Sequence, residues 1–391
     1  MNNSLLNTEI QQFIEDNLQT PVLKLALQKN PFPEVDWIEI LNQISCKSKA
    51  KDKLPTFYQT KNILYPSKIS LEQTSSEQTA NYKSELVSGK NLIDLTGGFG
   101  VDDYFFSKKV TKIVHCELNE ELSQIVKHNF EQLKVENSDF YFGDSYEILQ
   151  NLNQKFDWIY IDPSRRNDAK GKVFMLKDCL PNVPDLLDFY LEYSNNILIK
   201  TAPILDISAG LSELKNVKEI HIVAVENEVK ELLWIIEKNY SKEIEIKTIN
   251  FNKEAIERFD FQYDSGSYAS IGLPQKYLYE PNSAIMKSGG FNEIRSAFPV
   301  EKLHQHSHLY TSNTQIEFPG RIFEIENCFS YSKNDMKVFI EKTKANITTR
   351  NFPETVEVIR KKWKIKDGGN RYCFFTTDLN NNKIVLLCKK L

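Results

Sequence analysis

Short runs of β-branched and aromatic residues alternate with longer amphipathic segments through the middle of the chain. This alternation is typical of a doubly wound α/β fold with a parallel sheet. The predicted strands are 92–95, 112–117, 140–143, 158–162, 197–201, 220–225 and 244–251, and the predicted helices are 101–108, 120–133, 146–152, 186–193, 207–214 and 229–238.

The pattern differs on both sides of this region. Apolar residues over 5–27 recur mostly at three- and four-residue steps, which predicts short amphipathic helices interrupted at Pro21. After about residue 255, Gly, Ser, Pro and Tyr become frequent, and turn signals at 265–267 and 288–290 indicate a small α+β module.

The last segment is predicted to hold a strand at 345–349, a helix at 354–363 with Pro353 in its first turn, and strands at 372–376 and 383–388. The expected parts of the chain are a helical region at 1–75, an α/β domain at 76–255, an α+β module at 262–335 and a final module at 336–391.

Composition narrows the class of protein. The chain has 391 residues, of which 41% are hydrophobic, so it can build large cores. No apolar run approaches the roughly 20 residues that span a bilayer, and the N-terminus lacks the cationic start of a secretory signal. The six cysteines are scattered singly, a pattern that fits reduced thiols. We therefore expect a cytoplasmic protein without a membrane segment.

Charge is distributed unevenly along the chain. Residues 336–391 hold ten Lys and three Arg against five acids, a charge of +8. Because the whole chain has a net charge of −4, residues 1–335 carry −12. A basic end on an acidic body is a hint of contact with a polyanion such as RNA.

Residues 94–100, Asp-Leu-Thr-Gly-Gly-Phe-Gly, follow a predicted buried strand and precede a predicted helix. A glycine-rich turn at this place lets the backbone approach a ligand and leaves its N–H groups free to bind it. The dinucleotide fingerprint would need a further glycine at position 103, where the chain has Asp103. The turn therefore departs from the NAD pattern.

Three acids stand at or just after strand ends, namely Glu117, Asp144 and Asp162. Because the carboxyl ends of an open α/β sheet line one crevice, these side chains are expected to meet there. Glu117 could accept hydrogen bonds from a ribose diol and Asp144 from an adenine amine. The alternative is that each acid only caps a helix or a turn.

These residues resemble the class I S-adenosylmethionine-dependent methyltransferases, and among them the bacterial methyltransferases with a C-terminal THUMP-like domain. The segments that carry the resemblance are 72–77 (Glu-Gln-Thr-Ser-Ser-Glu), 94–102, 162–166 (Asp-Pro-Ser-Arg-Arg), 200–203 (Lys-Thr-Ala-Pro), 279–282 (Tyr-Glu-Pro-Asn), 318–321 (Phe-Pro-Gly-Arg) and 349–353 (Thr-Arg-Asn-Phe-Pro).

The resemblance implies a seven-stranded Rossmann-like domain, a ferredoxin-like module and a THUMP-like module, with S-adenosylmethionine as the cofactor. Residue by residue, it assigns the cofactor's methionine part to Asp94, Thr96, Gly97, Gly98 and Gly100, its ribose to Glu117, its adenine to Asp144, and a further contact to Asp162.

The segment at 162–166 resembles the loop with which amino methyltransferases present a planar nitrogen to the methyl group. It implies catalytic roles for Asp162, Pro163 and Ser164, in which Asp162 accepts a hydrogen bond from the target amine. The aromatic residue of that loop is missing here. Arg165 and Arg166 are therefore assigned to substrate, and the alternative is an intramolecular pair with a nearby aspartate such as Asp178.

Basic residues of the final module, namely Arg350, Lys361 and Lys362, alternate with aromatic residues, a combination suited to binding RNA. Trp363 in the same segment could instead belong to the core. His304, His306 and His308 alternate, so they would point the same way on a strand, but they lack acidic or Cys partners and no metal is expected.

Together these observations predict a methyltransferase that modifies a base of a structured RNA, tRNA or rRNA, preferably at nitrogen. A methyltransferase for a protein or small molecule, and an RNA-binding protein without catalysis, are the alternatives. The sequence leaves the oligomeric state open.

Overall fold

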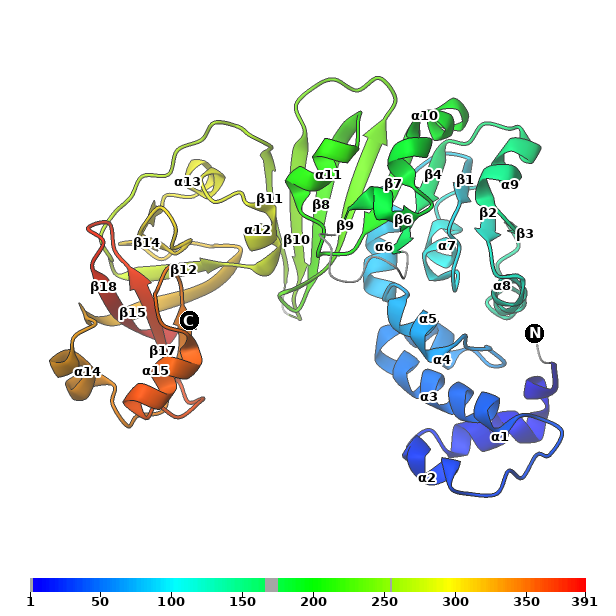
Figure 1. Cartoon of the computed structure of the whole chain (residues 1–391), viewed down its shortest axis with the longest axis horizontal. Helices are drawn as coiled ribbons and strands as arrows, with labels where there is room; N and C mark the ends of the chain where they lie inside the picture. Colours follow the sequence, from blue (N-terminus) through cyan, green and yellow to red (C-terminus); the bar gives the residue numbers. More distant parts are fainter. Residues whose placement is uncertain (1–2, 166–174, 254) are drawn as a thin grey trace. The chain divides into compact units, whose positions relative to one another are not determined.

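The computed structural model describes residues 3–165, 175–253 and 255–391, and Figure 1 labels their helices and strands. The chain divides into two compact units, which we describe separately: Met1–Lys218 with Trp234–Ser241, and Glu219–Leu233 with Lys242–Leu391. Within the described ranges, no helix has both the length and the apolar character needed to cross a membrane.

The first unit begins with the short helices that the apolar spacing predicted, and Pro21 precedes the second of them. They are η1 (Asn3–Leu6), α1 (Thr8–Asp16), α2 (Val22–Ala26), α3 (Trp37–Lys53), α4 (Pro55–Gln59), α5 (Lys68–Gln73) and α6 (Glu77–Glu85). Phe57 of α4 packs in one core with Phe99 and Val101, which belong to the glycine turn and the helix after it. The helical region therefore supports the turn directly.

The α/β part of the first unit is a parallel sheet of order β7-β4-β1-β2-β3. Chain order reverses between β1 and β4, which places a crevice at their carboxyl ends. The strands are β1 (Asn91–Asp94), β2 (Lys112–Glu117), β3 (Ser138–Phe142), β4 (Trp158–Ile161) and β7 (Asn196–Thr201), and the helices are α7 (Val101–Phe106), α8 (Glu120–Gln132), α9 (Ser145–Leu152), α10 (Val183–Tyr193) and α11 (Ile207–Glu213). These elements confirm the predicted α/β fold.

The predicted helix at 229–238 is wrong, because this segment is the strand β9 (Glu228–Glu237). It follows β8 (Val217–Val225) after two residues, Glu226 and Asn227, whose φ angles are 50° and 61°. Two consecutive residues with positive φ form the type I′ turn that closes a tight β-hairpin. Residues 232–236 (Leu-Leu-Trp-Ile-Ile) are all buried, and such a short apolar run does not distinguish a helix from a strand by its period.

The second unit continues the hairpin with β10 (Glu245–Phe251) and β11 (Ile256–Gln262), in the order β11-β10-β8-β9. β10 pairs parallel with β8, and β11 pairs antiparallel with β10. The predicted strands 220–225 and 244–251 are therefore confirmed, with β9 and β11 added to the predicted set.

A second sheet of order β13-β14-β12-β15-β18-β17-β16 fills the rest of this unit. Thr355 caps the last helix, so Pro353 precedes that helix rather than standing in its first turn as predicted. The strands are β12 (Tyr277–Pro281), β13 (Glu301–Lys302), β14 (Tyr310–Ser312), β15 (Gly320–Ser330), β16 (Asn346–Thr349), β17 (Arg371–Thr377) and β18 (Lys383–Lys390), and the helices are α12 (Ser283–Ser288), α13 (Glu293–Ala297), α14 (Lys333–Phe339) and α15 (Val356–Trp363).

The histidines at 304, 306 and 308 lie in the segment between β13 and β14, so no strand aligns their side chains. The His304 ring contacts Asn381 through Nε2 and Asn351 through Nδ1, at 3.1 and 2.9 Å. The His308 ring stacks on Phe291 with 3.6 Å between centroids. Over the ranges that the structure describes, no cluster of ligating side chains could hold a metal ion.

Candidate active site

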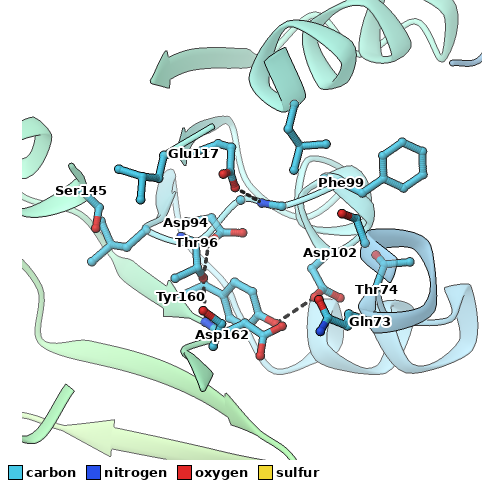
Figure 2. A pocket seen from close by; sticks show the side chains of 18 of the residues that line it. Gln73, Thr74, Asp94, Thr96, Phe99, Asp102, Glu117, Ser145, Tyr160 and Asp162 are labelled. Atoms are coloured by element: carbon cyan, nitrogen blue, oxygen red, sulfur yellow. Dashed lines mark hydrogen bonds between the residues drawn. The ribbon is translucent and has the colours of Figure 1, made fainter. Parts of the chain in front are cut away.

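A pocket of about 520 Å³ opens at the carboxyl ends of β1, β2 and β4, at the reversal of strand order. Figure 2 shows acidic side chains from several segments around this cavity. Nine of the residues predicted for the site line the pocket: Asp94, Thr96, Gly97, Gly98, Gly100, Glu117, Asp144, Asp162 and Ser164. The fold therefore brings these predicted residues together.

The buried carboxylate of Asp94 organises the start of the glycine turn. Its Oδ1 accepts hydrogen bonds from the amide and the hydroxyl of Thr96, at 2.7 and 3.1 Å. The Thr96 hydroxyl in turn accepts from the amide of Asp162 at 2.7 Å, as Figure 2 shows. Thr96 therefore ties the turn after β1 to the end of β4, a link that a glycine at this position could not make.

The amides of the glycine turn are used inside the protein, contrary to the expectation that they are free for a ligand. Gly97 donates to the carbonyl of Cys116, Gly98 to the carboxylate of Glu117, and Gly100 to the carbonyl of Gly97, at 2.8, 2.9 and 2.9 Å. The glycines instead make room. A Cβ at Gly97 would overlap the His115 ring, and Gly100 has a φ of 72° with Val126 2.6 Å from the place of its Cβ.

The Glu117 carboxylate lies at the end of β2 and is half-buried. Its two oxygens accept from the amides of Gly98 and Asn119, at 2.9 and 2.8 Å. These two bonds fix the position of the carboxylate at the pocket. Because each carboxylate oxygen can accept more than one hydrogen bond, Glu117 can still accept from a ligand.

Asp144 lies in the pocket wall and also caps α9, where its Oδ1 accepts from the amides of Tyr146 and Glu147 at 2.9 and 3.3 Å. The alternative interpretation of this acid as a helix cap is thus observed. Both cap bonds use the same oxygen, so a cap and a ligand contact are compatible at this carboxylate.

Asp162 forms an ion pair with Lys200, a residue of β7 for which the sequence predicted no role. Ile161 of β4 is in register with Ile199 of β7, so Asp162 and Lys200 follow as the next residues of two adjacent strands. The Lys200 side chain is only 12% exposed and that of Asp162 is 36% exposed. Lys200 belongs to the segment 200–203, which carries part of the family resemblance. Its pairing with Asp162, however, depends on the register of β4 and β7.

The residues after Asp162 differ in how the structure places them. Pro163 is buried, and Ser164 is exposed in the short strand β5 (Ser164–Arg165), which pairs with β6 (Cys179–Leu180). Arg166 and the side chain of Arg165 lie outside the described residues, so their predicted substrate role stays a prediction.

The N-terminal region reaches the pocket through Gln73, Thr74 and Ser75, which the sequence analysis did not assign to the site. Ser75 donates to Asp102 Oδ2 at 3.0 Å and accepts from the buried Lys83 ammonium at 3.1 Å. The marker segment 72–77 was the available signal, but only the packing of α5 and α6 against the glycine turn and α7 shows which site this segment reaches.

Ionisation under the pocket is set by burial and by two lysines. Burial alone would raise the pKa of the Asp102 carboxyl, but the Lys83 and Lys200 ammonium groups and hydrogen bonds from Tyr160 and Ser75 outweigh it and lower this pKa. The hydrogen bond from the Tyr160 hydroxyl is 2.8 Å long and appears in Figure 2. Asp102 is therefore an ionised carboxylate in the pocket wall.

Two deeper acids behave differently. Burial, followed by the neighbouring Asp103 charge, raises the pKa of Asp94 well above its usual range, and burial also raises the pKa of Asp103. Asp103 lies 2.6 Å from His115 Nδ1, and burial lowers the pKa of that imidazole. These buried groups favour their neutral forms and shape the turn.

The predicted RNA-binding residues of the second unit have intramolecular partners in two cases. Arg350 pairs with Glu280 at 2.8 Å, and Lys362 pairs with Glu354 at 2.9 Å. Lys361 is exposed on α15, whereas Trp363 is buried in the core, as its alternative interpretation held.

Comparison with known proteins gives two domain matches. Residues 277–319 match a family model described as a ferredoxin-like domain, and residues 320–390 match one described as THUMP domain-like. These ranges cover β12 to β14 and β15 to β18 of the second sheet.

Two relatives extend this result. The crystal structure of a candidate methyltransferase from Porphyromonas gingivalis W83 is 29% identical and has a TM-score of 0.88, and the match covers 100% of this chain and 99% of that one. An uncharacterised RNA methyltransferase of Clostridium acetobutylicum is 34% identical over 103 residues, which are 25% of this chain and 23% of that protein.

The two C-terminal domain matches and the shared fold over the whole chain agree with the resemblance on which the sequence interpretation rests. The chain therefore carries a ferredoxin-like and a THUMP domain-like domain behind its α/β domain, and over its whole length it shares the fold of the candidate methyltransferase from Porphyromonas gingivalis.

Proposed function

We propose that the pocket binds S-adenosylmethionine and that the protein transfers its methyl group to a base nitrogen of a structured RNA, tRNA or rRNA. The observation that carries this proposal is the convergence of Glu117, Asp144 and Asp162 with the glycine turn around one pocket. The predicted domain bounds and the cytoplasmic location, supported by the free cysteine thiols, belong to the same proposal.

The pocket wall suits the donor's chemistry. Its volume lies in the usual range for small-molecule sites, about 300–1,000 Å³. Glu117 and Asp144 offer acceptors for the ribose diol and the adenine amine, and the exposed Leu118 beside them offers an apolar surface for the adenine ring. Asp102 and Asp162 line the pocket, whereas Lys83 and Lys200, which pair with them, do not, so carboxylate oxygens face the place of a cationic sulfonium.

When bound, the cofactor supplies a methyl carbon that its positively charged sulfur has activated. The chain's own residues then have to align the acceptor and receive its hydrogen bonds. In this proposal the Asp162 carboxylate accepts from one N–H of the target amine and the Pro163 carbonyl from another, so that the nitrogen lone pair points at the methyl group. Alignment of this kind can supply on the order of 7–11 kcal/mol.

Lys200 acts in this scheme through Asp162, because its ammonium fixes the position of that carboxylate. Lys200→Met should lower kcat by about tenfold or more, which is the loss of one charge-assisted hydrogen bond, while the dissociation constant of the donor changes little. Steady-state kinetics and calorimetry measure the two quantities.

Lys200→Arg, which keeps the positive charge, should restore part of the turnover. If Lys200→Met and Lys200→Arg lose donor binding to the same extent as turnover, the lysine shapes the pocket rather than the position of Asp162.

The RNA part of the proposal rests on the THUMP domain-like match, the +8 balance of the final segment and the activity stated for the Clostridium relative. Exposed lysines on and after α15, such as Lys361 and Lys364, are candidates for phosphate contacts. Deleting residues 336–391 would remove β16, β17 and β18 from the second sheet, so single substitutions test these contacts more cleanly.

The deciding experiment incubates the protein with radiolabelled S-adenosylmethionine and with total RNA from cells that lack it. We expect label in one RNA species, and nuclease mapping identifies the modified base and atom. Label in protein or small molecules but not in RNA would support the alternative acceptors. Donor binding without transfer of label to any acceptor would support the alternative of an RNA-binding protein without catalysis.

A further inference from the structure

Three of the marker segments that the active site does not use meet in the second unit. Glu280 of segment 279–282 lies on β12, Arg321 of 318–321 on β15, and Arg350 of 349–353 just after β16. Glu280 Oε2 accepts from Arg321 Nε at 2.7 Å and also contacts its Nη2, and Glu280 Oε1 accepts from Arg350 Nη2 at 2.8 Å. One carboxylate thus holds two guanidinium groups.

The charges in this group do not balance. The Glu280 side chain is 4% exposed, whereas the side chains of Arg321 and Arg350 are 39% and 34% exposed. One buried negative charge faces two half-exposed positive charges, so a net positive charge remains at the surface. Each guanidinium has five N–H donors and Glu280 takes three of the ten, which leaves a fork on each arginine for an anion. Arg350 Nε is buried without a hydrogen-bond partner.

The fold fixes both arginines before any ligand arrives. Glu280 and Arg321 are directly opposite in the register of β12 and β15. The Arg350 amide donates to the carbonyl of Phe375 at 3.0 Å, and the next residue, Asn351, receives a hydrogen bond from Thr377 at its carbonyl. A site built in this way loses little side-chain freedom when it binds.

Lys302 and Arg350 both act on the ring of His308. Burial lowers the pKa of His308 to about 4, and the positive charges of Lys302 and Arg350 act in the same direction. A groove of about 410 Å³, lined by residues 349 and 351–353 and by Lys383, adjoins Arg350 in the chain. It offers an aromatic ring, an amide and an ammonium group, and its lining residues flank Arg350 in the chain without including the Arg350 side chain.

We propose that Arg321 and Arg350 form a binding site for a phosphodiester group of the RNA substrate, with Glu280 as the residue that positions both guanidiniums and the adjoining groove as the place of the neighbouring nucleotide. This inference rests on the proposed RNA substrate. If the cluster only stabilised the fold, the contacts of the two arginines with Glu280 would be sufficient, and the N–H donors that Glu280 leaves unused would have no role.

The test measures RNA affinity as a function of salt for the full-length protein and for Arg321→Gln, Arg350→Gln and the double variant. The probe is bulk tRNA and rRNA from cells that lack the protein. Loss of one phosphate contact should reduce the slope of log K against log salt by about 0.7–0.9 and weaken binding at low salt by about tenfold or more. Donor affinity should not change.

Each single variant leaves Glu280 paired with one arginine. If the double variant unfolds because the Glu280 charge is then buried without a partner, adding Glu280→Gln to it removes that charge. The matched control is Arg360→Gln, because Arg360 is in the same domain and pairs with Asp367. Wild-type RNA affinity and slope in folded Arg321 and Arg350 variants would overturn the site. Donor binding by a wild-type protein that binds no RNA would overturn it together with the RNA substrate.

Pyrophosphate distinguishes the source of the anion. If the site takes an RNA phosphodiester, pyrophosphate should compete for RNA binding by the wild type only at millimolar concentration, and less in the double variant. Tight binding of pyrophosphate that both arginines control, with no effect of either arginine on RNA binding, would assign the site to a free phosphate compound and contradict the proposal.

Discussion

Asp162→Ala is expected to reduce methyl-transfer turnover by about 100-fold or more, the loss that a misplacement of the acceptor by about 1 Å can cause, while donor affinity changes by only a few-fold. The carboxylate is the pocket group that accepts from the target amine in the proposed mechanism, and Lys200 holds it in place. Single-turnover kinetics with labelled donor, together with calorimetry of donor binding, measure the two effects separately.

Two variants control this experiment. Asp162→Asn keeps the shape and one acceptor oxygen but loses the charge that Lys200 pairs with, so its turnover should lie between those of wild type and alanine. Asp139→Ala removes an exposed acid of β3 that pairs with Lys112, and it should leave both quantities unchanged. Equal losses of turnover and of donor affinity in Asp162→Ala would contradict a role in positioning the acceptor.

Glu117→Ala should weaken donor binding by about 100-fold, because hydrogen bonds to a charged group contribute roughly 1.5–3 kcal/mol each and a ribose diol makes two of them. The substitution also leaves the amides of Gly98 and Asn119 without their acceptor, so the turn should lose its fixed position. Calorimetric titration with S-adenosylmethionine measures the dissociation constant.

Glu117→Gln keeps one acceptor oxygen for these amides and should bind the donor more weakly than wild type but more tightly than alanine. Glu131→Ala, an exposed acid of α8, is the matched control for loss of one negative charge. Donor affinity that is unchanged in Glu117→Ala, in a protein with an unchanged melting temperature, would remove Glu117 from the cofactor site.

Together these two experiments separate the halves of the proposed function. Glu117 should act on the donor and Asp162 on the acceptor, although both lie on one pocket. The Lys83–Asp102–Ser75 network keeps its direct contacts in both variants, because neither substitution removes one of its hydrogen bonds or its ion pair.

Much of the pocket could be predicted because its position follows from chain order. In a parallel sheet the carboxyl ends of all strands lie on one edge, so a glycine turn after β1 and acids after β2, β3 and β4 must meet there once the strands are recognised. The hydrogen bonds of the loop amides, which were expected to be free for a ligand, were not predictable in this way. Their partners, such as the Cys116 carbonyl and the Glu117 carboxylate, belong to a neighbouring strand.

The wrong helix at 229–238 has a similar cause. Five of its apolar residues form the unbroken run 232–236, and a run of that length is compatible with the period of a helix and with that of a strand. The two positive φ angles at Glu226 and Asn227 decide for a hairpin, and neither residue type requires such an angle by itself.

The sequence by itself determined the alternation of strands and helices from β1 to α11, the glycine turn, the acids at the strand ends and the basic end of the chain, because each is encoded by neighbouring residues. Only the tertiary structure decided that Lys200 pairs with Asp162, that Ser75 of the N-terminal region reaches the pocket, and that Glu280 joins Arg321 to Arg350. These contacts link residues far apart in the chain, and strand register and packing, rather than local pattern, fix which of them meet.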